Sequence, residues 1–538
     1  MSAEEAARKP KVSRRGAAFL LVIAAVCAGL LLLYRQRELT LADPLTMLPA
    51  SSRLVISIDA VPLLSPGKNL EEYYSRWKNT DGYRFLAQAL KLKWKLDLDS
   101  DFLSWAGPRI AMASNVLDES PHKSFLKWKE KMPRLIIAAS IRDGNQAKKV
   151  IEKLEKRYRD TSSVTHIPYR GADIFSPDLR TGPHFCIYRH FLIIADSIDD
   201  LQKAIDAGLD RKSALASDRA FRESCATLPS PRFVTAFCNL GREKLSSDHS
   251  SWCLGAIKKK EGIVIDSVLK DDKTSPGASR GGDNDVEIFS MPRALPESTS
   301  FFLVLNSRKL LSIEDALPGA REKRTLSKAL RILAVKLRMP MLEGLSPKMN
   351  GEIGISIDIG SMLSTSLIES ISGRGTAPKL SPENLPGILT LGFREKISGS
   401  LPSLLDEAPL STLQTYKDHT IYSRKNVLVT PLDTLLCISL DGTLPHLELL
   451  IDTYLKSRPS IAGLNGFKVL SEGVTGGDLL CGYLKLDELE AALKLYSFVK
   501  PELKKLVELI GPYRAIWLKM TGEASLIRTR VFLEYHSE

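Results

Sequence analysis

Residues that could bind a metal or catalyse a reaction are scattered along this chain. No H-E-x-x-H pair is present, which removes the commonest signature of zinc hydrolases. His184 and His190 lie six residues apart around one apolar run, so they would share a strand face. Because no third ligand accompanies them, they are expected to be surface or turn histidines and not a metal pair. The eight histidines are His122, His166, His184, His190, His249, His419, His446 and His536.

Two segments have the composition of a nucleophile or anion site without its pattern. "SPGASRGG" around Ser279 lacks the G-x-S-x-G elbow and lies in a linker-like stretch, where no rigid base would orient the serine. "SGRGTAPK", residues 372–379, carries Arg374 but lacks the phosphate-loop spacing. It is expected to end a helix, with anion binding as the alternative. The sequence therefore predicts no catalytic, cofactor-binding or metal-binding residues and no cofactor.

Cysteine usage gives a weak signal. Four of the six cysteines beyond residue 34 lie in apolar, strand-like runs and are expected to be small buried side chains. An oxidising compartment would allow disulfides, but the spacing specifies none. The six are Cys186, Cys225, Cys238, Cys253, Cys437 and Cys481.

The elements that would position any site occur twice. "MLPASSRLVISIDAVPLL" from Met47 resembles "ALPESTSFFLVLNSRKLL" from Ala294, and Asp59 falls opposite Asn306, 247 residues later. In each copy a short polar residue ends an apolar strand. A helix cap is the favoured interpretation, and a paired binding site is the alternative.

Five further matches follow in the same order. Asp206 pairs with Asp452 at an offset of 246, and the first five offsets lie between 243 and 253. Ser197 and Thr443 are expected to cap helices in the two copies, and each half closes with a β-hairpin pattern. Six ordered matches indicate an internal duplication.

The predicted fold class is α+β: an N-terminal transmembrane helix followed by two tandem, homologous α+β lobes with largely antiparallel sheets. A ligand would be sought in a groove between the lobes. The predicted divisions are a cytoplasmic basic tail at 1–16, a transmembrane helix at 17–34, a first repeat at 45–270, a flexible linker at 271–287 and a second repeat at 288–538.

Residues 17–34 contain no charge, proline or side-chain amide. As a helix they would span about 27 Å, close to the hydrocarbon core of a bilayer. Cleavage near Ala25 or Ala28 is an alternative, because secretory signals also contain an apolar run. Cys27 is expected to be a helix residue and not a lipidated one, since Val26 is β-branched.

Flanking charge sets the expected orientation and partners. Five basic residues precede 17–34 and two follow, which favours a cytoplasmic N-terminus and a single-pass protein of the bacterial cytoplasmic membrane, with the large C-terminal region extracytoplasmic or periplasmic. The net charge of +12 would suit anionic lipid or envelope polymer. Nucleic acid is excluded, since no nucleic-acid motif accompanies the charge.

The basic pattern in 321–342 favours a core-covering helix, with membrane-surface contact as the alternative.

The matched segments carry a family resemblance. "LPASSRLVISID", "LDLDSDFLSWAGPRIAMA", "YRGADIFS" and "HFLIIADSIDDLQKAID" resemble the uncharacterised bacterial family known as domain of unknown function 3352 (DUF3352), over roughly residues 45–535. The resemblance implies an N-terminal anchor, a large extracytoplasmic region and a bacterial envelope setting. It implies no activity and no site residues.

Three functional hypotheses follow. The favoured one is a membrane-anchored, non-enzymatic binding or scaffolding component of the cell envelope, whose partner is another envelope protein, a polymer or lipid. The second is an extracytoplasmic hydrolase acting in the cleft between the two repeats, which would need converging buried polar residues. The third is an assembly factor without a ligand pocket, which would expose an apolar patch.

Overall fold

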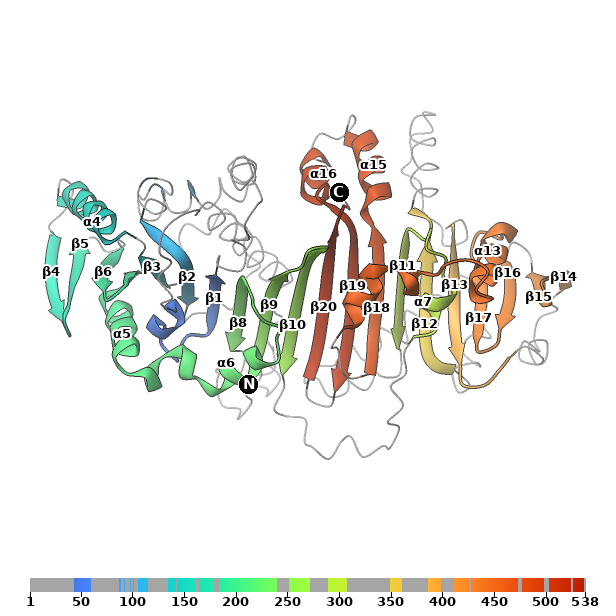
Figure 1. Ribbon diagram of the computed structural model, residues 1–538, viewed down its shortest axis with the longest axis horizontal. Coiled ribbons are helices and arrows are strands. Elements are labelled where there is room, and N and C mark those ends of the chain that lie inside the picture. The colour runs from blue at the N-terminus through green and yellow to red at the C-terminus, as the bar shows by residue number, and fades with distance from the viewer. Residues whose placement is uncertain are drawn as a thin grey trace, which may run out of the picture. The chain divides into compact units, whose positions relative to one another are not determined.

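The computed structural model (Figure 1) divides the chain into two compact units, Met1–Lys258 with Ile265–Lys273, and Lys259–Val264 with Thr274–Glu538. The structure describes residues 43–59, 105–114, 134–141, 143–159, 164–177, 183–239, 251–270, 289–306, 349–359, 386–397, 411–424, 427–472, 477–497, 503–523 and 526–536, with isolated positions between 87 and 100.

The first unit is built on an antiparallel sheet. Its apolar, β-branched runs pair in the order β4–β5–β6–β7–β3–β2–β1–β8–β9–β10. The strands are β1 (Leu54–Asp59), β2 (Ala106–Ser114), β3 (Leu135–Ile141), β4 (Val164–Tyr169), β5 (Ala172–Pro177), β6 (His184–Tyr188), β7 (Phe191–Ala195), β8 (Val234–Asn239), β9 (Ser251–Lys258) and β10 (Gly262–Lys270). The helices are η1 (Pro44–Met47), α4 (Gly144–Arg159), α5 (Ile198–Leu209), η5 (Arg211–Ser213), η6 (Leu215–Ser217) and α6 (Arg219–Ala226).

The second unit repeats this pairing order, as β14–β15–β16–β17–β13–β12–β11–β18–β19–β20. Its strands are β11 (Phe301–Asn306), β12 (Met349–Ile357), β13 (Gly387–Phe393), β14 (Ser411–Tyr416), β15 (His419–Arg424), β16 (Val427–Leu432), β17 (Leu435–Ser439), β18 (Gly477–Lys485), β19 (Tyr513–Glu523) and β20 (Leu526–Tyr535). Its helices are α7 (Met291–Ala294), α13 (Leu444–Tyr454), η8 (Ile461–Gly463), α14 (Asn465–Ser471), α15 (Leu486–Ser497) and α16 (Leu503–Ile510).

Equivalent residues occupy equivalent register positions. Asp59 ends β1 opposite Arg109, and Asn306 ends β11 opposite Glu352. After β18 the numbering offset between the units grows. The second unit carries α15 and α16 between β18 and β19 (Figure 1), so Cys253 of β9 corresponds to Trp517 of β19.

One helix cap agrees with the sequence pattern and the other differs. The Ser197 hydroxyl accepts a hydrogen bond from the Asp200 amide at 3.1 Å, as an N-cap should. Thr443 precedes α13, but its hydroxyl donates to Asp441 at 2.8 Å and makes no backbone cap. Thr443 therefore occupies the predicted N-cap position, but its hydroxyl bonds to Asp441 in place of a backbone amide of α13.

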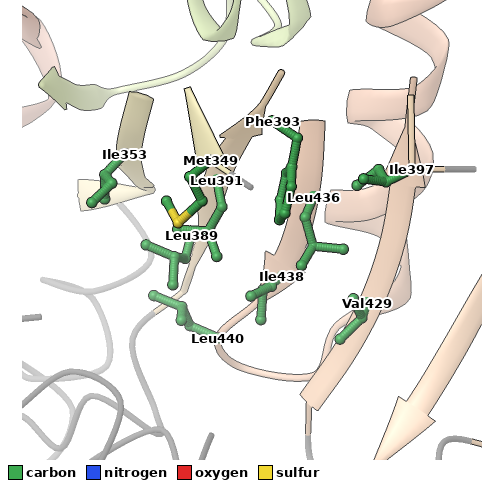
Figure 2. Packing of buried hydrophobic residues seen from close by; sticks show 10 residues of the cluster. All are labelled: Met349, Ile353, Leu389, Leu391, Phe393, Ile397, Val429, Leu436, Ile438 and Leu440. Atoms are coloured by element: carbon green, nitrogen blue, oxygen red, sulfur yellow. The ribbon is translucent and has the colours of Figure 1, made fainter. Parts of the chain in front are cut away.

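The sheet faces form the cores. In the second unit, buried aliphatic and aromatic side chains from β12, β13, β16 and β17 pack together (Figure 2). Burying each such side chain contributes about 1.5–3 kcal/mol, so this cluster is a principal source of the unit's stability. It comprises Met349, Ile353, Leu389, Leu391, Phe393, Ile397, Val429, Leu436, Ile438 and Leu440.

The predicted fold class, α+β lobes behind an N-terminal transmembrane helix, is wrong and is corrected here. Antiparallel strands predominate over helices in the described residues. Within those residues, no helix combines the length and the apolar character that a membrane crossing requires. The longest described helix, α4, has 16 residues and is rich in lysine and arginine, against the roughly 20 apolar residues of a span. The predicted span 17–34 lies outside the described residues.

Candidate functional site

A turn joined to a helix by a tyrosine, a cation and an aspartate is the candidate site, and it occurs once in each unit. In the first unit the Tyr169 hydroxyl donates to Asp206 of α5, 3.0 Å from each carboxylate oxygen. Arg170 Nη1 lies 3.2 Å from Asp206 Oδ1. The Arg170 guanidinium lies 5.6 Å from the Tyr169 ring centroid, which is cation–π distance. These contacts attach the β4–β5 turn to α5.

The second unit builds the same contacts from α13. The Tyr416 hydroxyl donates to Asp452 Oδ1 at 3.1 Å, and Lys417 Nζ lies 2.7 Å from the same oxygen. Lys417 Nζ also lies 5.7 Å from the Tyr416 ring centroid. A second cation, Arg458, approaches Asp452 Oδ2 to 3.6 Å. The offsets from the first unit are 247 for the tyrosine and the turn cation and 246 for the aspartate.

The backbone of both turns is unusual for a cation. Arg170 has φ +48° and Gly171 +83°, while Lys417 has φ +47° and Asp418 +66°. Two-residue hairpins with both central φ values positive favour asparagine, aspartate or glycine there. A long cationic side chain in this region of φ is uncommon. Both units nevertheless place a cation at the first central position, where it reaches the helix aspartate.

Exposed leucines and further cations follow each helix aspartate along the chain. Leu209 and Leu455 are 42% and 43% exposed, and each lies three residues after the helix aspartate. Leu209 is the last residue of α5, and Leu455 is the C-cap residue of α13. Exposed cations follow each leucine within three residues. We call the two groups the first and second basic-leucine patches. The first comprises Arg170, Leu209, Arg211 and Lys212, and the second comprises Lys417, Leu455, Lys456 and Arg458.

The pKa shifts in the patches keep the tyrosines neutral and the ion-paired side chains charged at neutral pH. Burial and the hydrogen bond to Asp452 raise the pKa of Tyr416, and burial and Asp206 do the same for Tyr169. The hydrogen bond from Lys417 lowers the pKa of Asp452, and that bond raises the pKa of Lys417. None of these shifts moves a group toward neutral pH, where a general acid or base is most effective. The patches are suited to binding.

The ion pair at Asp452 predicts a pH dependence. Because the folded pKa of Asp452 is below its unfolded value, its contribution to stability is present above the unfolded pKa and is lost as pH falls through the folded pKa. The stability of Lys417→Asn relative to the wild type should therefore rise as the pH falls from 7 to about 2, because only the wild type loses this ion pair, while the preference of asparagine for positive φ acts equally at both pH values. Urea unfolding at the two pH values measures this, and an equal difference at both would contradict it.

The strand-end residues Asp59 and Asn306 lie in polar clusters. Arg109 Nε lies 2.9 Å from Asp59 Oδ2, and nearby Asp43 accepts from the Leu45 amide at the start of η1. Burial raises the pKa of Asp43. Asn306 is buried opposite Glu352. The residues that follow Asp59 and Asn306 lie outside the described residues, so the helix-cap and paired-site interpretations stay predictions.

In the second unit Glu352 performs the capping. It is buried and accepts hydrogen bonds from the Ser290 amide at 3.1 Å, the Ser290 hydroxyl at 2.6 Å and the Met291 amide at 2.7 Å. Negative charge at a helix N-terminus is stabilising. Glu352 and Arg109 occupy the same register position, so the two units carry opposite charges there.

The histidines are placed apart. His184 Nδ1 lies 3.0 Å from the Ser176 hydroxyl and its pKa is lowered by burial, while His190 lies in the turn after β6. His166 bridges Asp173 at 2.8 Å and Glu155 at 2.5 Å, and the bond to Asp173 raises its pKa. Among the described residues, no three His, Cys, Asp or Glu side chains are grouped to hold a metal ion. Ser279, Arg374, residues 321–342 and Cys27 lie outside the described residues.

Sequence reasoning missed the patches. Their signal was present as "YRG" at Tyr169 and "YKD" at Tyr416, 247 residues apart, followed by the aligned Asp206 and Asp452. Only the aspartates were matched. The contact between turn and helix depends on tertiary packing, which the local pattern does not show.

Comparisons with known proteins place the chain in a family. Among solved structures, crystal form III of TP0453 is 10% identical, with a TM-score of 0.23, 43% of this chain covered and 80% of that one. Crystal form I of TP0453 is 11% identical, with a TM-score of 0.24 and coverages of 44% and 81%. No curated protein matches the chain. The family model described as "Protein of unknown function (DUF3352)" matches residues 15–331, more than half of the sequence. The chain therefore belongs to the DUF3352 family of proteins of unknown function.

Proposed function

We propose that this chain is a non-enzymatic binding component of the bacterial cell envelope, and that it binds anionic lipid headgroups through its two basic-leucine patches. The observation that carries the proposal is the duplication of the patches. A tyrosine, a turn cation, a helix aspartate, an exposed leucine and two following cations recur in the same order at offsets of 245 to 247. An extracytoplasmic location stays a prediction.

The chemistry of the patches fits a lipid surface. Each combines three cations with one exposed leucine. Arg170, Lys417 and Arg458 also pair with a helix aspartate. Arg211, Lys212 and Lys456 are therefore the charges most open to phosphate groups while the leucine enters the headgroup boundary. Cations near an anionic surface contribute about 1 kcal/mol each. The chain's net charge of +12 adds a long-range attraction of the same sign. An acidic protein partner would pair with the cations, but it would not explain why both patches also expose a leucine.

Vesicle binding tests the proposal. The full chain should sediment with vesicles containing phosphatidylglycerol and much less with vesicles of phosphatidylcholine alone, and added salt should weaken the binding. Replacing the second patch's cations, with Lys417→Asn, Lys456→Gln and Arg458→Gln, should lower the affinity at least tenfold and up to roughly 100-fold. Asparagine suits the positive φ at position 417, so the turn should survive the change.

A matched control removes three exposed cations elsewhere in the first unit. The control variant carries Lys148→Gln, Lys149→Gln and Lys156→Gln, three exposed positions of α4. It loses three positive charges, as the variant of the second patch does. The control should bind vesicles nearly as well as the wild type. If the patch variant and the control lost vesicle affinity equally, the effect would come from net charge alone. That result would overturn the assignment of lipid binding to the patches. Binding to an acidic protein that persists while vesicle binding is absent would do so as well.

A further inference from the structure

Two buried thiols of the first unit lie in contact. Cys225 Sγ of α6 is 3.0 Å from Cys253 Sγ of β9. Cys225 is 7% exposed and Cys253 is 0% exposed. Their sequence separation of 28 residues gave no indication of the pairing. Forming a bond requires the sulfurs to approach by about 1 Å, to the usual S–S length of about 2.05 Å.

Neighbouring contacts hold the two elements in place. The Ser224 and Ser251 hydroxyls lie 2.9 Å apart beside the thiols and join the same helix and strand. Arg232 Nη1 donates to the Cys225 carbonyl at 2.8 Å, so a fixed cation adjoins the pair. Gly255 leaves room for it, because a Cβ there would lie 2.5 Å from Arg232 Cδ. A hydroxyl pair and a cation therefore both lie beside the two cysteines.

The second unit fastens the equivalent elements differently. Residue 471, which corresponds to Cys225, is a serine, and Trp517 stands where the first unit has Cys253. Trp517 packs against Gly466 of α14, where a Cβ would lie 2.1 Å from Trp517 Nε1. In the second unit, α14 therefore packs on β19 through the close fit of Trp517 against Gly466. In the first unit, two thiols lie between the equivalent elements α6 and β9.

We propose that Cys225 and Cys253 are a redox pair that forms a disulfide, locking α6 onto β9 in the first unit. The proposal rests on the contact between the two sulfurs and on the neighbouring cation, and it does not depend on the proposed lipid binding. The oxidant is a low-molecular-weight disulfide such as glutathione disulfide.

The reaction is a double thiol–disulfide exchange. The Cys225 thiolate attacks one sulfur of glutathione disulfide, forming a mixed disulfide and releasing one glutathione thiolate. Cys253 then loses its proton, and its sulfur attacks Cys225 Sγ, releasing the second glutathione. The two protein thiols are oxidised, one glutathione disulfide is reduced to two thiols, and those thiols take up the two protons. The hydrogen bond from Cys253 and the charge of Arg232 lower the pKa of Cys225, which suits it to attack first.

Counting thiols tests the inference. The full chain is incubated with glutathione disulfide, then unfolded in denaturant with an alkylating reagent and measured by mass spectrometry. Of its seven cysteines, five should be alkylated without reductant and seven after reduction. Proteolysis should yield one linked pair of peptides containing Cys225 and Cys253. Closing a 28-residue separation should also raise the melting temperature of the oxidised protein by roughly 7–14 °C over the reduced form.

Two single variants separate this pair from other thiols. Cys225→Ser should leave six alkylated cysteines, because its partner becomes free. Cys437→Ser, a buried cysteine of β17 in the second unit, should leave four. Seven alkylated cysteines in the treated wild type, or linked peptides that contain a different pair, would overturn the proposal. Vesicle binding by the same samples is scored separately, so failure of either proposal is distinguishable from failure of the other.

Discussion

Replacing Trp517 by alanine is expected to lower the free energy of unfolding of the second unit by about 3–5 kcal/mol. Trp517 is 1% exposed, and its ring centroid lies 4.2 Å from that of Tyr483 and 6.5 Å from that of Phe467. Its Nε1 donates to Glu534 Oε2 at 2.7 Å. The substitution removes the aromatic packing and also leaves that carboxylate without its indole donor. Urea unfolding followed by far-UV circular dichroism measures the loss.

A second substitution shows whether the contact with α14 is the cause. Gly466→Ala should cost about 1–3 kcal/mol in the wild type, because the added methyl group would overlap the Trp517 ring. In the Trp517→Ala background that group has room, and alanine favours helix over glycine, so the same change should be neutral or stabilising there. Equal costs in the two backgrounds would contradict the packing described for α14 and β19.

Replacing Glu352 by alanine is expected to destabilise the second unit by about 3 kcal/mol. Its carboxylate accepts three hydrogen bonds from Ser290 and Met291, and its removal leaves buried donors unsatisfied. Glu352→Gln should cost less, since an amide oxygen still accepts but the charge at the N-terminus of α7 is lost. Urea unfolding of the three proteins gives the order.

An exposed acid near the same element provides the control. Glu297 lies shortly after α7 and its side chain is exposed. Glu297→Ala should change stability by less than about 0.5 kcal/mol, as for most surface substitutions. A Glu352→Ala variant as stable as Glu297→Ala would show that the buried carboxylate does not hold α7.

Local patterns predicted the strands and the alignment of the two copies well. Apolar runs marked β1 and β11, and the shared Leu-Pro before each strand aligned Asp59 with Asn306. Both Leu-Pro segments make the same isolated bridge, Pro49 with Ala214 and Pro296 with Ser460. Such features are readable because they depend on neighbouring residues and on a spacing that the copies preserve.

Features that depend on tertiary contact were not predictable. The contact of Cys225 with Cys253 arises because α6 packs on β9, and neither residue carries a local sign of it. The turn cations Arg170 and Lys417 pair with helix aspartates that lie 36 and 35 residues further along the chain. The fold class was predicted wrongly from the alternation of strand-like and helical patterns, because short apolar runs fit strands and helices alike.

The most direct test of duplicated lipid binding compares three variants in the vesicle assay: one without the first patch's cations (Arg170→Asn, Arg211→Gln and Lys212→Gln), one without the second patch's, and one without both. Each single-patch variant should bind phosphatidylglycerol vesicles more weakly than the wild type. The double variant should bind them no better than vesicles of phosphatidylcholine alone. A folded double variant that binds phosphatidylglycerol vesicles as tightly as the wild type would contradict the assignment of lipid binding to these two surfaces.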